Sequence, residues 1–382
     1  MLRVAVLGAN GFIGSRTIEM LHLAGLAEVR PVVRTVAGLA GSSRFDLEGR
    51  VADAFDRAAL RRAFDGCEVI VHAIAGDRKT IIETAGTAYE AAEEAGARRL
   101  VYLSSASVHG QAPVPGTDED SPLSDRQPID YNNAKVRAER KLLSLRKRGS
   151  VEVVILRPGI VFGPRSFWIT SFADDLLRGE AYVMDGGRGI CNSIYVDNLI
   201  HAIFLAMSAS GVDGEAFIVG DDEEITWADL YRPVAEALGF NLQQVPDAVY
   251  TDPPFSWKKA AKQILAARPS RAVLGVIPGR LRRALRSLLT GRSRQFSPWS
   301  FPHAQQPSTG QPVATLEKAM LYGCRYKLSD AKARGMLGYR PIVSFAEGCR
   351  RSVGWLAFTG YPVCEVNFSQ SPIRRHRRLI GG

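Results

Sequence analysis

A tyrosine and a lysine four residues apart form the pair in this sequence whose types and spacing best suit proton transfer. Tyr131 and Lys135 stand one helical turn apart, so both are expected to project from the same helix face. A free phenol has a pKa of about 10, and a neighbouring ammonium favours the phenolate and lowers that value. We therefore predict that Tyr131 is a general acid and base and that Lys135 tunes it.

A glycine-rich turn near the N-terminus predicts what this pair works on. Gly8, Gly11 and Gly14 allow a tight turn and a close approach of the backbone to a pyrophosphate, although their spacing differs from the commoner G-x-G-x-x-G. The free N–H groups of the following helix would face the phosphates. Ser105 ends an apolar run between the turn and the pair, and its hydroxyl can hydrogen-bond a substrate oxygen. Together these features predict a redox enzyme that uses a nicotinamide dinucleotide.

The elements that must position these residues are short apolar runs alternating with helical patterns. We expect strands at residues 2–7, 29–33, 68–72, 99–104 and 151–156, and helices at 12–23, 56–64, 80–95 and 131–148. This alternation predicts an α/β fold with a doubly wound parallel sheet of the Rossmann type. Ligands bind such sheets outside the carboxyl ends of the strands. The residues that directly follow predicted strands, and so should line that edge, are Gly8, Asp53, Ala73, Ser105 and Gly159.

Two charged residues near the expected cofactor bear on its identity. Arg34 ends the second strand, where an NAD site would carry a carboxylate, so a cation there favours the 2′-phosphate of NADP over NAD. The alternative is a solvated arginine on a loop. Asp53 follows a further short strand expected at Val51, the third along the chain, and its carboxylate can accept a hydrogen bond from the adenine amino group. The alternative for Asp53 is a helix N-cap near Asp56.

The set of motifs resembles the extended short-chain dehydrogenase/reductase family, including its nucleotide-sugar epimerase/dehydratase and 3β-hydroxysteroid dehydrogenase branches. The segments that carry the resemblance are residues 8–14, 103–110, 131–135, 157–165, 194–199, 337–341 and 345–355. The resemblance covers about residues 1–220 and 325–358. It implies a Rossmann domain over 1–165, to which 190–220 returns, and a smaller C-terminal α+β substrate lobe over 166–365.

The same resemblance assigns the candidate site residues, and it implies no metal ligand. The expected catalytic residues are Ser105, Tyr131 and Lys135. The expected cofactor-binding residues are Gly8, Asn10, Gly11, Phe12, Ile13, Gly14, Arg34, Asp53, Ala54, Ala73, Ile74, Ala75, Lys135, Pro158, Gly159, Ile160 and Val161. The expected substrate contacts are Ser107, His109, Cys191 and Asn192, with His109 standing where the family usually has tyrosine.

Departures from the family pattern bear on the substrate. Nucleotide-sugar members usually carry Asn at the position of Ile160 and often Arg at that of Cys191, and an apolar chain and a thiol cannot replace these groups at a pyrophosphate. Sugar dehydratases also place Asp-Glu after the catalytic hydroxyl residue, where this chain has Ala106 and Ser107.

The residues therefore favour interconversion of a secondary alcohol and a ketone on a bulky, lipid-like or polyketide-like molecule. A nucleotide-sugar epimerase is the first alternative, because epimerisation uses the same three catalytic residues. A non-catalytic NADP-binding sensor or scaffold is the second alternative.

Composition narrows the class of protein further. The chain has 382 residues, 46% hydrophobic and 23% charged, and contains no apolar run long enough to span a membrane. Its five cysteines are scattered without a Cys-x-x-Cys, which predicts a reducing, cytoplasmic setting and no disulfide framework. Family members often dimerise through the helices expected at 80–95 and 131–148, so we expect a homodimer.

The net charge of +10 is concentrated late in the chain. Residues 253–316 contain eleven Lys and Arg and no Asp or Glu, within an expected insertion over 252–312. Residues 280–291 show an amphipathic helical pattern flanked by arginines, and the basic tail at 366–382 is expected to be disordered. Peripheral contact of 280–294 with an anionic membrane, contact with an anionic substrate, and a solvated basic face remain open alternatives. Nucleic acid is not an expected partner, because no recognised binding module is present.

Overall fold

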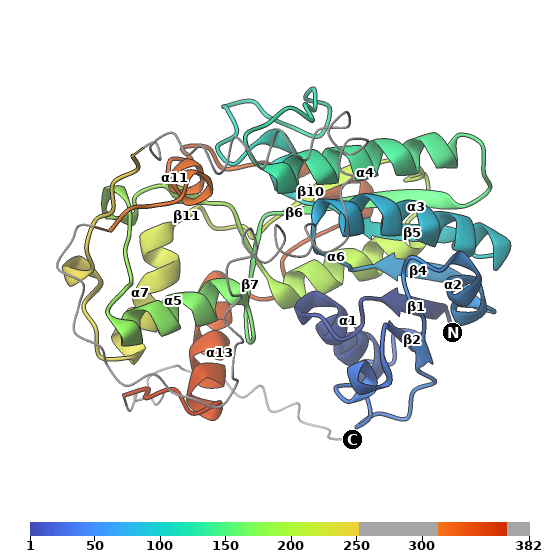
Figure 1. Ribbon diagram of the computed structural model, residues 1–382, viewed down its shortest axis with the longest axis horizontal. Helices are drawn as coiled ribbons and strands as arrows, with labels where there is room; N and C mark the ends of the chain where they lie inside the picture. Colours follow the sequence, from blue (N-terminus) through green and yellow to red (C-terminus); the bar gives the residue numbers. More distant parts are fainter. Residues whose placement is uncertain (252–311, 365–382) are drawn as a thin grey trace, which may run out of the picture.

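The computed structural model describes residues 1–251 and 312–364. Its centre is a seven-stranded sheet in the order β10-β6-β5-β4-β1-β2-β3, with every neighbouring pair parallel (Figure 1). The strands are β1 (Arg3–Leu7), β2 (Glu28–Val33), β3 (Arg50–Val51), β4 (Val69–His72), β5 (Arg99–Leu103), β6 (Glu152–Pro158) and β10 (Ala216–Val219). The predicted α/β Rossmann fold is confirmed, since five of these strands lie where the apolar runs placed them.

Helices cover both faces of the sheet (Figure 1). One face packs against α1 (Phe12–Leu23) and α6 (Val196–Ser208), and the other against α2 (Arg57–Phe64), α3 (Arg78–Glu94) and α4 (Asp130–Arg146). Strands β1, β4, β5, β6 and β10 are buried on both faces, which explains why they are largely continuous apolar runs.

Parallel pairing brings the chemistry-bearing residues to one edge. β1 pairs with β2 and β4, and β5 pairs with β4 and β6, so that all five strands run in one direction. Their carboxyl ends are followed by the glycine turn, Arg34, Ala73, Ser105 and Gly159. The fold thus places these residues along the edge where open α/β sheets bind ligands.

A smaller lobe, the one predicted to bind substrate, lies at one end of the sheet (Figure 1). It contains α5 (Phe167–Arg178), α7 (Trp227–Ala237), α11 (Leu316–Tyr322), α13 (Phe345–Phe358) and the short strands β7 (Ile160–Phe162), β8 (Ile190–Cys191), β9 (Ser193–Tyr195) and β11 (Ile225–Thr226). Stacked rings form much of its core: Trp227 stacks on Tyr322 at 4.7 Å and Phe172 on Tyr231 at 3.9 Å between centroids.

The late helix α12 (Ala331–Leu337) packs on the sheet's core and not on the core of the substrate lobe. A buried carboxylate and a buried amide hold the chain where it comes back to the sheet. Asp221 accepts hydrogen bonds from the Tyr195 backbone and from the Asn198 amide at 2.7–3.0 Å. Asn198 in turn accepts from the backbone of Ile342 and Val343. Because each buried polar atom here has a partner, the C-terminal segment is fixed to the beginning of α6.

The glycine turn has geometric reasons for its composition. Gly8 has φ +89°, a conformation that glycine adopts easily and other residues rarely do. A Cβ on Gly14 would lie 2.2 Å from the Gly8 carbonyl oxygen, so no side chain fits there. Strand β1 and helix α1 can therefore approach closely only with these glycines.

The predictions for the basic insertion at 252–312, its amphipathic pattern at 280–291 and the tail at 366–382 lie almost entirely outside the described residues. Among residues 1–251 and 312–364, no helix is both long and apolar enough to cross a bilayer.

The close approach at Gly14 generates a stability prediction. We expect Gly14→Ala to lower the free energy of unfolding by about 1–3 kcal/mol, because the added methyl group overpacks the turn. Gly335→Ala is the matched control: Gly335 lies within α12 with open space around its Cα, so alanine should be neutral or stabilising by up to about 1 kcal/mol. Urea denaturation measures both, and equal effects would contradict the steric argument.

Candidate active site

A cavity of about 290 Å³ follows the carboxyl ends of β1, β2 and β4. The predicted cofactor residues that line it are Gly8, Asn10, Gly11, Arg34, Asp53, Ala54, Ala73, Ile74 and Ala75. Helix α1 begins at this cavity, and its N-cap Gly11 contributes no side-chain hydrogen bond, so the first-turn N–H groups are open to an anion. The open helix end and the side-chain-free turn fit the pyrophosphate of a dinucleotide.

Other predicted cofactor residues lie next to this cavity but do not line it. Phe12 lines a neighbouring cavity between α1 and α13, Ile13 is half-buried, and Gly14 is buried against Gly8. The prediction also missed lining residues, namely Leu7, Val32, Val33, Thr35, Ala52, Phe55, Thr80 and Thr84. Most of these residues are next in sequence to residues that were predicted. Their position at the ends of strands could therefore have identified them as lining residues.

Arg34 and Asp53 both reach the cavity. Arg34 is exposed and makes no ion pair with any residue of the described ranges, so its charge is available to a ligand. Asp53 accepts a hydrogen bond from the Phe55 backbone at 3.0 Å. The N-cap of α2 is Asp56, whose side chain accepts from Ala59, so the alternative role of Asp53 as that cap is wrong.

The predicted catalytic pair lies at the beginning of α4, above the end of β5. Lys135 is only 2% exposed and donates a hydrogen bond of 2.7 Å to the carbonyl oxygen of Leu103. Its Nζ lies 5.8 Å from the ring centroid of Tyr131, whose side chain is half-buried. The helix therefore brings the phenol and the ammonium to the same strand end as Ser105.

The protonation of Tyr131 differs from the expectation. Burial raises the pKa of the Tyr131 phenol above its usual value, and the hydroxyl of Ser105 only partly opposes this effect. Lys135 faces the ring of Tyr131 and donates to Leu103, which explains why the expected lowering does not dominate. In the structure Tyr131 is thus a protonated phenol at neutral pH, the form that donates a proton.

Ser105 is oriented by its neighbour Ser107. The Ser105 hydroxyl oxygen accepts from the Ser107 backbone N–H at 3.2 Å and from the Ser107 hydroxyl at 2.9 Å. A hydroxyl that accepts two hydrogen bonds still has its own hydrogen to donate. Ser105 can therefore donate to Tyr131 or to a substrate oxygen.

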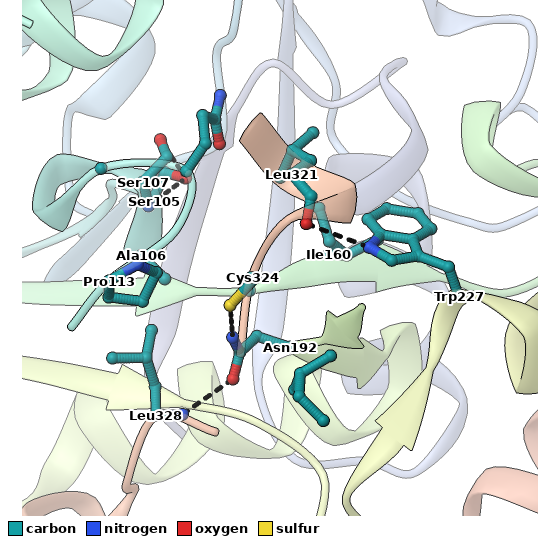
Figure 2. A pocket seen from close by; sticks show the side chains of 14 residues that line it. Ser105, Ala106, Ser107, Pro113, Ile160, Asn192, Trp227, Leu321, Cys324 and Leu328 are labelled. Carbon is teal, nitrogen blue, oxygen red and sulfur yellow. Dashed lines mark hydrogen bonds between the residues drawn. The ribbon is translucent and has the colours of Figure 1, made fainter. Parts of the chain in front are cut away.

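A second, smaller cavity of about 50 Å³ opens beside Ser105 (Figure 2). Its walls are mainly apolar and include no charged side chain among the described residues; they comprise Ser105, Ala106, Ser107, Gly110, Gln111, Pro113, Gly159, Ile160, Ile190, Asn192, Trp227, Leu321, Cys324 and Leu328. Two of the predicted cofactor residues, Gly159 and Ile160, line this cavity and not the first one, while Pro158 is buried and Val161 half-buried. The volume suits the reacting end of a substrate.

Of the four expected substrate contacts, two line this cavity and two do not. Ser107 and Asn192 line the cavity, although the Asn192 side chain accepts from the Leu328 backbone N–H and lies against the Cys324 sulfur (Figure 2). Its amide nitrogen also donates to the Tyr326 carbonyl. Cys191 instead lies fully buried in the core of the lobe, so its thiol does not reach the cavity.

His109 has another structural partner. Its Nε2 lies 3.2 Å from a guanidinium nitrogen of Arg157, and because arginine only donates, Nε2 is the acceptor. Burial, and then the charge of Arg157, lower the pKa of His109 to about 4. His109 is therefore a neutral hydrogen-bond acceptor for Arg157, and it does not line the cavity beside Ser105.

No group of three or more histidine, cysteine, aspartate or glutamate side chains within 1–251 and 312–364 is arranged to hold a metal ion.

Comparisons with known proteins agree with this geometry. The family model described as NAD dependent epimerase/dehydratase family matches residues 4–220. A 3 beta-hydroxysteroid dehydrogenase/Delta 5-->4-isomerase from Mycobacterium tuberculosis is 30% identical over 290 residues, which span 70% of this chain and 76% of that protein. A UDP-glucose 4-epimerase from Vibrio cholerae is 24% identical over 266 residues, which span 65% of this chain and 79% of that protein.

Solved structures share the fold. A dTDP-glucose 4,6-dehydratase (DesIV) from Streptomyces venezuelae, with NAD bound, superposes with a TM-score of 0.67 at 22% identity over 93% of this chain and 97% of that one. The fold, the glycine turn and the family match agree. The chain belongs to the NAD dependent epimerase/dehydratase family, and it is an NAD(P)-dependent oxidoreductase of the extended short-chain dehydrogenase/reductase type.

Proposed function

We propose that the protein interconverts a secondary alcohol and a ketone on a bulky, largely apolar molecule, with NADP(H) as its cofactor. The observation that carries the proposal is the uncharged, apolar cavity against Ser105, beside a protonated and half-buried Tyr131. A carbonyl on an apolar carbon skeleton matches these walls, because its oxygen needs donors and the rest of the molecule does not.

The residues suggest how the reaction proceeds. Ser105 donates a hydrogen bond to the substrate oxygen, and Tyr131 transfers its proton to that oxygen as the ketone is reduced. The bound dinucleotide supplies the hydride for reduction, or accepts it in the reverse direction. The ammonium of Lys135 stabilises the phenolate that remains on Tyr131 after proton transfer. Since burial raises the pKa of the free phenol, Tyr131 begins in the protonated form that ketone reduction requires.

The alternative of a nucleotide-sugar epimerase uses the same three residues and has support in the relatives that are UDP-glucose 4-epimerases. A nucleotide diphosphate, however, needs cations or several hydrogen-bond donors. Ile160 and the buried Cys191 supply neither. An apolar ketone, such as the steroids named for the dehydrogenase relatives, suits the cavity better. Because the cavity is small, we propose that it holds the carbonyl-bearing end and that the bulk extends outward.

The assembly that we propose is a homodimer. Helices α3 and α4 pack side by side on one face of the sheet (Figure 1) and form the surface through which a second copy would bind. Peripheral membrane contact through residues 280–294 also remains a proposal.

The first prediction concerns substrate class and Tyr131. Purified protein should oxidise NADPH, followed at 340 nm, with apolar cyclic ketones and not with UDP-sugars. Tyr131→Phe should lower kcat by about 100-fold or more, because it removes the transferred proton, while the affinity for NADPH changes little. Full activity of Tyr131→Phe on the same ketone would contradict the role of the phenol. Turnover of a UDP-sugar alone would favour the epimerase alternative.

The second prediction concerns Arg34 and the choice of cofactor. Arg34→Asp should weaken NADP(H) binding by about tenfold or more and leave NAD(H) binding unchanged or stronger, because the cation that pairs with a 2′-phosphate is removed. Arg61→Asp makes the same charge change on the exposed surface of α2, outside the cavity, and is the control. Titration calorimetry measures both cofactors; an equal loss for the two would contradict the assignment.

A further inference from the structure

A buried ion pair lies behind the catalytic residues. Arg157 on β6 makes two hydrogen bonds to Glu139 on α4, Nε to Oε1 at 3.1 Å and Nη2 to Oε2 at 2.8 Å. The two side chains are 5% and 2% exposed. A buried pair loses much of its hydration, and apolar residues of similar size are often as stabilising, so stability alone is a weak reason for this pair.

The pair contacts each segment that carries a catalytic residue. Ser104, which immediately precedes Ser105, donates its hydroxyl hydrogen bond to Glu139. The remaining guanidinium nitrogen of Arg157 contacts His109, at the end of the turn that follows Ser105, and the carbonyl oxygen of Glu119 at 3.0 Å. The pair therefore holds both ends of the segment that presents Ser105, because Glu139 accepts from Ser104 before it and Arg157 contacts His109 after it.

Glu139 also lies one helical turn after Lys135 on the same face of α4. Burial lowers the pKa of Lys135 to about 8, and the negative charge of Glu139 opposes this lowering. A pKa of about 8 lies near neutral pH, so the charge of Lys135 depends on its neighbours. Without Glu139 the amine would lose its proton at a lower pH.

The other groups around Lys135 do not replace Glu139. On β4, His72 donates from Nε2 to Thr84, whose own hydrogen goes to the Thr80 carbonyl, and burial lowers the pKa of His72 to about 3, so it is neutral. On β5, Tyr102 is a neutral ring 5.0 Å from Nζ. The titratable side chains that face Lys135 are His72, Tyr102, Tyr131 and Glu139. Those that face Arg157 are Glu139, His109 and Glu119. Glu139 is the anion among those that face Lys135.

We propose that Glu139 and Arg157 are positioning residues of this oxidoreductase: Glu139 supplies a negative charge one helical turn from Lys135, and the pair fixes Ser105 beside it. The inference rests on the proposed function, because it assigns a role to residues that act through Ser105, Tyr131 and Lys135.

The test is the pH dependence of NADPH binding, measured by fluorescence titration from pH 7 to 10, which requires no substrate. This range lies above the second pKa of the cofactor's 2′-phosphate, about 6. In the native protein the affinity should be constant at low pH and begin to fall as pH rises through the Lys135 pKa near 8, because the ammonium attracts the anionic cofactor and the neutral amine does not. In Glu139→Gln this onset should move down by about one pH unit.

Three variants make the result specific. Lys135→Met should abolish the fall. Asp125→Asn is the matched control: it also removes a carboxylate partner of α4 arginines, Arg137 and Arg140, but at the surface, and should leave the onset unchanged. If Glu139→Gln alone does not fold, Glu139→Gln/Arg157→Gln leaves no unpaired buried charge and should show the same downward movement.

An unchanged onset in a folded Glu139 variant, with Lys135→Met still abolishing the fall, would overturn the inference and leave the proposed function standing. An onset that persists in Lys135→Met would also overturn it, since another group would then titrate. Failure of the proposed function would show separately, as turnover that survives in Tyr131→Phe.

Discussion

The burial of one ammonium group, that of Lys135, connects the catalytic side chains to the sheet. Its hydrogen bond to the Leu103 carbonyl ties the beginning of α4 to the carboxyl end of β5, and so brings Tyr131 to Ser105. The same burial makes the charge sensitive to its surroundings, because removing an ammonium from water favours the neutral amine. Position and protonation at this site are therefore two consequences of one buried group.

Close backbone contacts make room for the ligands. Gly8 and Gly14 bring β1 against α1, and a Cβ on Gly159 would lie 2.0 Å from the carbonyl oxygen of Asn192. The first contact opens the helix end to a phosphate, and the second holds β7 beside the Ser105 cavity. These glycine positions tolerate no side chain. Many residues that line the cavities are small or apolar, so the shape of a cavity bears more on which molecule fits than its charge does.

Local patterns in the sequence were sufficient to predict most of the sheet, its carboxyl edge, and nine of the residues that line the first cavity, because strand and helix periods are local. They could not predict that Cys191 faces the core, which follows from the antiparallel pairing of β8 with β11. Nor could they predict the partner of His109, which is Arg157, 48 residues later in the chain on the neighbouring strand β6. The raised pKa of Tyr131 likewise depends on tertiary burial, which outweighs the nearby lysine.

A crystal structure with bound NADPH and a substrate ketone tests the account most directly. It should place the hydroxyl groups of Tyr131 and Ser105 both within about 3 Å of the carbonyl oxygen, and Lys135 within hydrogen-bonding reach of the nicotinamide ribose. The carbonyl carbon should face the nicotinamide beside Ile160. A phenol directed away from the carbonyl, or a ketone bound outside the Ser105 cavity, would contradict the central claim that Tyr131 supplies the proton.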